Sequence, residues 1–185
     1  MVTPVNINDL FSLIDRYVKL NFLVVLVNSN LQRWTDEIDD SLFDIDFGNL
    51  GLSGEIQKQL GSHPNLNQLR KYRDEIMLLK DNACTRVFGG MIGLPLDERI
   101  ALKDYADRNI DELNVKIQEC QSVYLVVVER IDEAKRNKDS KMTRQLGRLA
   151  KDNYNKMYKY NIMNQFYSNV SNYLRGMINV LTQKK

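Results

Sequence analysis

Residues 106–134, ADRNIDELNVKIQECQSVYLVVVERIDEA, decide the fold of this 185-residue chain. Apolar side chains recur in this stretch at alternating spacings of four and three, which is the heptad pattern of a coiled-coil helix. The seam consists of Ala106, Ile110, Leu113, Ile117, Cys120, Tyr124, Val127, Ile131 and Ala134. Asp97 and Glu98 follow Pro95, and carboxylates favour the positive end of a helix dipole. We therefore predict one helix over residues 96–136.

The same spacing returns after the polar turn at residues 137–140. In the predicted helix 141–182 the seam consists of Tyr160, Met163, Tyr167, Val170, Leu174, Met177 and Leu181. Two helices of about forty residues joined by so short a turn must run antiparallel. We predict a coiled-coil-like C-terminal hairpin about 60 Å long, at 1.5 Å per residue. Its buried residues should include Ile117, Val127, Val170 and Leu174.

Additional apolar residues lie beside these two seams and widen the apolar stripe beyond what one helix pair can bury. They include Val123, Val126 and Val128 in the first helix and Ile162, Phe166, Tyr173 and Ile178 in the second. Other helices should cover them, and the N-terminal helix is the obvious candidate.

Two more helices are predicted before the hairpin. One covers residues 7–38, with Asn6 or Asn8 as its N-cap, and the other covers residues 65–87 and stops at Gly89-Gly90. The glycine-rich stretch 39–64 between them should be an irregular loop, with one helical turn around residues 55–60. The fold is predicted to be all-α: residues 1–185 form a single domain, an elongated antiparallel helical bundle with a long C-terminal hairpin.

The composition, 43% hydrophobic and 27% charged with 9 Gly and 3 Pro, is typical of a globular chain. The longest apolar run, residues 22–27, is far shorter than the roughly 20 residues of a membrane-spanning helix. The N-terminus lacks the features of a secretory signal. We expect a cytoplasmic or intracellular protein with no membrane span, whose isolated Cys84 and Cys120 are reduced.

Known catalytic and metal-binding patterns are not found in the sequence. The chain has one histidine, His63, and no Glu-x-x-His or His-Glu-x-x-His pair. The glycines at 89, 90 and 93 lack the Lys and Ser/Thr of a phosphate loop, and residues 44–55 lack the required glycine of a calcium loop. We predict a protein that is not an enzyme and has no catalytic residue, metal or cofactor.

Charge is divided unevenly along the chain. Residues 1–133 have a net charge of −8 and residues 134–185 a net charge of +10. Five cations in the last helix fall at spacings that place them on one face, with Tyr154 beside them: Lys141, Arg144, Arg148, Lys151 and Lys159. A predicted acidic docking patch consists of Asp36, Glu37, Asp39, Asp40, Asp44 and Asp46.

Two functions fit this pattern. The first is a helical interaction or scaffold protein that self-associates, or docks another protein, through its heptad faces and opposite-charge patches. The alternative is a nucleic-acid-associated protein, either nucleocapsid-like or an accessory subunit, whose basic C-terminal helix contacts phosphates while tyrosines stack on bases. A solvated basic helix face accounts for the same cations equally well, so the sequence does not choose between them.

Overall fold

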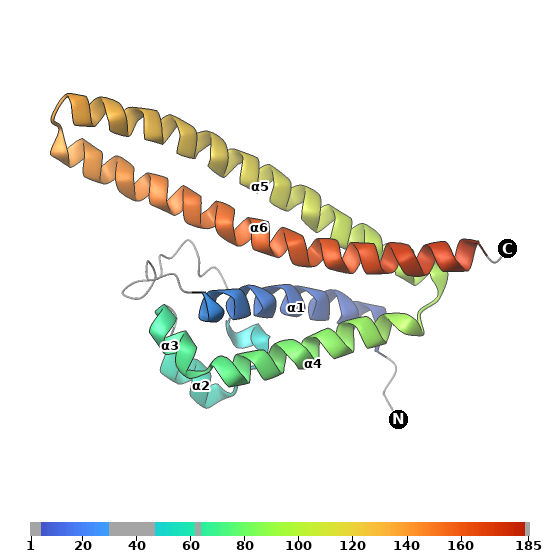
Figure 1. Ribbon diagram of the computed structural model, residues 1–185. Coiled ribbons are helices and arrows are strands. Elements are labelled where there is room, and N and C mark those ends of the chain that lie inside the picture. Colours follow the sequence, from blue (N-terminus) through green and yellow to red (C-terminus); the bar gives the residue numbers. More distant parts are fainter. Residues whose placement is uncertain (1–4, 30–46, 62–63, 184–185) are drawn as a thin grey trace.

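The computed structural model describes residues 5–29, 47–61 and 64–183, and these residues form helices without any strand. The all-α prediction is confirmed. The elements are α1 (Ile7–Asn28), η2 (Phe47–Leu50), α2 (Gly54–Leu60), α3 (Leu66–Lys71), α4 (Arg73–Ile92), α5 (Leu96–Arg136) and α6 (Ser140–Thr182). In Figure 1, α1 lies between the long α5–α6 hairpin and α4.

The hairpin follows its prediction to within one residue at each helix end. In the turn, Lys138 has a φ of 55°, and the Asp139 carboxylate accepts a hydrogen bond from the Met142 amide at 2.9 Å, which caps α6. Val127, Val170 and Leu174 are buried as predicted. Ile117 is only half-buried, which corrects its prediction: in a two-helix seam the burial of each residue depends on the side chains opposite it, so Val127 is buried and Ile117 is not.

Helix α1 supplies much of the core, with Leu10, Ile14 and Val18 fully buried. The Asn6 side chain accepts from the Asn8 amide at 3.1 Å and so provides one of the two predicted caps. The helix ends at Asn28, not at residue 38 as predicted, because Ser29 is extended and both its amide and its hydroxyl donate to the Leu26 carbonyl. Residues 30–38 lie outside the described part of the chain.

The predicted helix 65–87 is wrong at both its middle and its end. Tyr72 interrupts the predicted helix and separates α3 from α4. Asn65 and Gln68 form a capping box at the start of α3. Helix α4 then runs through Gly89-Gly90 to Ile92. A Cβ at Gly90 would lie 2.9 Å from Leu10 Cδ2, so this glycine allows close packing of α1 on α4 instead of ending the helix. The loop predicted over 39–64 contains η2 and α2. With seven residues, α2 is about two turns long, so the expectation of a single turn there is wrong.

The hairpin is longer than the helix that supports it. Tyr17 of α1 packs edge-on against Phe166 of α6, with ring centroids 5.9 Å apart, and the two helices run antiparallel. The end of α1 at Asn28 is therefore level with about residue 155 of α6. Figure 1 shows the hairpin continuing past this end. We call this part, residues 121–155, the distal arm; at 1.5 Å per residue it extends about 25 Å beyond α1.

Candidate docking surface on the distal arm

Four of the five predicted cations form an exposed row on the distal arm. Lys141, Arg144, Arg148 and Lys151 are all exposed, and none makes an ion pair with another described residue. We call these four residues the basic stripe. Residues 140–151 contain no carboxylate, so the segment has a net charge of +4. The next cation differs: Lys156 donates to Asp152 at 2.8 Å, and this hydrogen bond raises the pKa of the lysine.

Lys159 does not belong to the exposed row, which corrects its predicted place there. It is buried, with 6% of its surface exposed, and its Nζ lies 5.9 Å from the centroid of the Tyr160 ring. Its face of α6 continues the basic stripe at helical spacing but meets the bundle, as the Phe166 contact with α1 shows. The basic face is therefore open to solvent only along the distal arm.

Tyr154 lies at the base of the arm. The residue is 40% exposed, and its ring lies 6.1 Å, centroid to centroid, from the ring of Tyr124 on α5. It is a surface residue supported by the other helix of the hairpin, so part of its ring is accessible to a partner.

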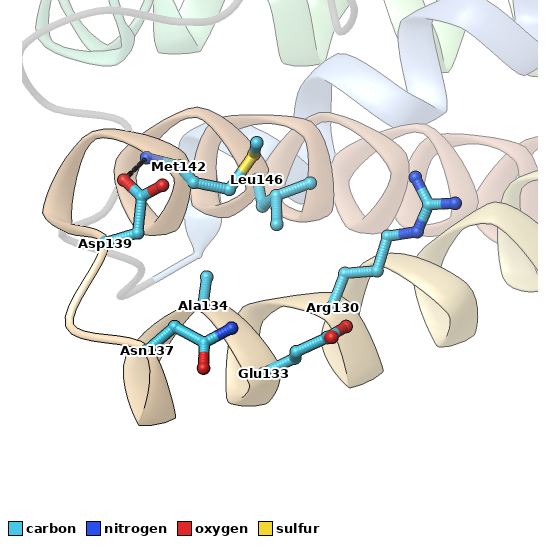
Figure 2. A pocket seen from close by; sticks show the side chains of 7 residues that line it. All are labelled: Arg130, Glu133, Ala134, Asn137, Asp139, Met142 and Leu146. Carbon is cyan, nitrogen blue, oxygen red and sulfur yellow. Dashed lines mark hydrogen bonds between the residues drawn. The ribbon is translucent and has the colours of Figure 1, made fainter.

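A groove of about 380 Å³ lies between the helices at the tip of the arm (Figure 2). Ala134 of α5 faces Met142 and Leu146 of α6 across it, and Arg130 and Glu133 stand at one end. The turn residues Asn137 and Asp139 complete the lining. Its size is at the small end for ligand pockets, and its apolar centre suits one or two apolar side chains of a partner.

The arm also carries apolar side chains that none of the described helices covers. Val123, Leu125 and Val126 of α5 are 42–56% exposed, and Met142 and Leu149 of α6 are 45% and 43% exposed. Cover by another helix, predicted from the wide apolar stripe, is therefore wrong for Val123 and Val126. It is right for Ile162 and Phe166, which pack against the core. Apolar residues gathered in this way mark interaction surfaces.

Several candidate residues lie elsewhere. The predicted acidic patch, Asp36, Glu37, Asp39, Asp40, Asp44 and Asp46, and also His63, lie outside the described residues. Cys84 and Cys120 are free and half-buried, and burial raises the pKa of the Cys120 thiol. Within residues 5–29, 47–61 and 64–183, no three His, Cys, Asp or Glu side chains gather as metal ligands would.

A second groove, of about 390 Å³, lies among α1, η2 and α4 and is lined by Arg16 and Arg86. Arg16 already donates to the Asn49 carbonyl at 2.9 Å and so holds η2 against α1. Arg16 therefore has a structural role, and no such role is seen for the residues of the basic stripe among the described residues.

Comparison of the chain with protein-family models, with curated proteins and with solved structures finds no match. A search of the described helices also finds none with the length and apolarity of a membrane span.

Proposed function

We propose that the protein is a non-enzymatic docking protein whose distal arm binds an acidic surface of a protein partner. The observation that carries this proposal is the basic stripe: four exposed cations without a described carboxylate partner, on an arm that extends beyond α1. Exposed like charges in a row repel one another, and an acidic partner would relieve this repulsion.

A protein partner is favoured by the apolar residues beside the stripe. Met142 and Leu149 are exposed on the flank of the same helix, and Met142 also lines the tip groove. Protein interfaces combine an apolar centre with a polar and charged rim, and their affinity depends on a few buried anchors. The stripe would orient the partner, and the groove and Leu149 would bury its apolar side chains.

Nucleic-acid binding is the second candidate. The stripe extends about 15 Å along α6, so several of its cations could contact successive phosphates, and the exposed part of Tyr154 could stack on a base. Burial of Lys159 shortens the row by one cation relative to the sequence prediction. This candidate makes no use of the exposed Met142 and Leu149.

Binding of two fluorescent probes to the full-length protein tests both functions. One probe is an oligo-glutamate peptide with interspersed leucines, and the other is oligo-uridine RNA. Protein docking predicts that the peptide binds, that Arg144→Glu with Arg148→Glu abolishes binding, and that Leu149→Ser weakens it. The matched control is Arg73→Glu with Arg86→Glu, which makes the same charge change at exposed positions of α4.

Nucleic-acid binding predicts a different result. RNA would bind, Leu149→Ser would leave its affinity unchanged, and each phosphate contact would contribute about 0.7 to the slope of log affinity against log salt. Failure of both probes to bind at low salt would contradict both functions.

A further inference from the structure

The outer face of α5 is apolar where the helix has no neighbour among the described elements. Val115 follows the seam residue Leu113 by two positions, and Val126 follows Tyr124 by two. Two positions correspond to a rotation of about 200° around the helix axis, so both valines point away from α6. They are 53% and 51% exposed, and the exposed Val123 and Leu125 flank Val126. Residues 123–128 are apolar on every side of the helix, although α6 covers only one side. A helix that is apolar all round is normally covered.

Acidic residues surround this apolar face. From residue 111 to residue 133, α5 contains six carboxylates and two cations, a net charge of −4. The carboxylates are all exposed: Asp111, Glu112, Glu119, Glu129, Asp132 and Glu133. The net charge of this stretch is equal and opposite to the +4 of residues 140–151. The hairpin therefore has one acidic and one basic helix surface.

The two charged surfaces lie on opposite edges of the same hairpin. Each cation of the basic stripe comes two positions before a buried or half-buried residue of α6, namely Thr143, Leu146, Ala150 and Asn153. The stripe therefore points away from α5, just as Val115 and Val126 point away from α6. One molecule cannot bring its own two surfaces together, so they can meet only between molecules.

The two surfaces also lie at the same distance from the tip. Arg130 and Glu133 line the tip groove together with Met142 and Leu146, so residues 130–133 of α5 are level with residues 142–146 of α6. If two hairpins lie side by side in the same orientation, Glu129 and Glu133 of one molecule meet Arg144 and Arg148 of the next. Apolar Val126 of the first molecule then approaches the stripe near Lys151.

We propose that the partner of the basic stripe is a second copy of this chain, which places the outer face of its α5 on the stripe. This inference rests on the proposed docking function and identifies its partner. The contact joins two different surfaces, so each copy keeps one free edge, and association continues as an open row or closes as a ring. Because the contact extends over only about three helical turns, each contact is weak and assembly depends on concentration.

Sedimentation equilibrium of the full-length protein over a range of concentrations tests the inference. Molecular mass should rise with concentration at about 0.01 M salt, where charges act over about 30 Å, and should fall toward the monomer near 1 M, where they act over about 3 Å. Arg144→Glu with Arg148→Glu, and separately Glu129→Lys with Glu133→Lys, should each weaken association at least about tenfold at low salt. The α4 variant, Arg73→Glu with Arg86→Glu, should associate as the unaltered protein does.

Mixing the two charge-reversed variants is the decisive step. Each variant alone should associate at least about tenfold more weakly than the unaltered protein, but together they restore opposite charge at every contact, so the mixture should assemble. A chain that carries all four substitutions should also assemble. Monomers at every concentration in low salt, or assembly that neither variant weakens, would overturn the inference. If the unaltered protein stays monomeric while the acidic peptide still binds the stripe, the docking function stands and only its partner is wrong.

Discussion

The hydroxyl of Tyr167 in α6 donates a hydrogen bond to the carboxylate of Asp15 in α1 at 2.7 Å, across 152 positions of the sequence. Tyr105 of α5 donates to the same oxygen at 2.6 Å. One carboxylate thus joins three helices at the point where the hairpin packs on α1. The two hydroxyls are part-buried and depend on Asp15 for their acceptor.

Loss of this carboxylate should destabilise the bundle. Asp15→Ala leaves two part-buried hydroxyls without their acceptor, so we expect a loss of about 3 kcal/mol in the free energy of unfolding. Asp15→Asn keeps a side-chain oxygen and should lose about 1 kcal/mol. Urea denaturation measures both, with Asp104→Ala, at an exposed carboxylate of α5, as the control. Equal losses for Asn and Ala would mean that the hydrogen bonds contribute nothing.

Stability should fall in alkaline solution. Burial, together with the neighbouring Asp15, raises the pKa of Tyr105 and of Tyr167 above the ordinary value of 10.0. Above about pH 10 the unfolded chain releases these protons while the folded protein keeps them, so the stabilisation present below pH 10 is lost as pH rises. The expected slope is about 1.4 kcal/mol per pH unit for each tyrosine.

Urea denaturation between about pH 8 and about pH 11 measures this slope on both sides of the ordinary tyrosine pKa. Tyr105→Phe with Tyr167→Phe should reduce the slope of the free energy of unfolding against pH, whatever the stability of the double variant at neutral pH. Tyr173→Phe, at an exposed ring, controls for the loss of a hydroxyl. An unchanged slope in the double variant would refute this assignment.

The seam of the hairpin should not be uniformly sensitive to truncation. Leu174 is fully buried against the core, so Leu174→Ala should cost about 3 kcal/mol. Ile117 is half-buried, so Ile117→Ala should cost about 1 kcal/mol. Thermal and urea denaturation of both variants give the comparison. A larger loss at Ile117 than at Leu174 would mean that more covers Ile117 than α6 alone.

Two neighbouring glycines of α4 should respond in opposite ways to alanine. At Gly89 a Cβ would meet nothing within 4 Å, so Gly89→Ala should gain up to about 1 kcal/mol from helix propensity. At Gly90 it would lie 2.9 Å from Leu10 Cδ2, and Leu10 is fully buried. Gly90→Ala should therefore destabilise the protein, by about 1–3 kcal/mol. Denaturation midpoints should move in opposite directions, and a gain at Gly90 would contradict the packing described for α1.

The hairpin could be predicted because its heptads are local. The spacing of Leu113, Val127 and Leu174 reports which side of each helix is buried without reference to the rest of the chain. The burial of Lys159 and the exposure of Val126 could not be predicted in this way. Whether a given turn of α5 or α6 is covered depends on where α1 ends, and that end is set by Ser29, more than 90 positions away from either residue.

The glycines of α4 show the second kind of failure. In the sequence, Gly89-Gly90 resembles a helix stop, because glycine disfavours helix. Its role depends on the approach of Leu10, which only the folded bundle reveals. The interruption at Tyr72 likewise has no local signal that we can identify. On the distal arm, the sequence pattern placed four cations on one helix face, and all four are exposed, but it did not predict the exposed apolar residues beside them.

The length of the arm beyond α1 has a consequence for how the protein unfolds. The part of the bundle around α1 is held by contacts among several helices, whereas, among the described residues, the arm is held by the seam between α5 and α6 alone. Backbone amides of the arm should exchange with deuterium through local opening that leaves the part around α1 intact, and protection should decrease toward the turn at Lys138. A partner that covers the arm would slow this exchange, so the same measurement maps the contact residue by residue.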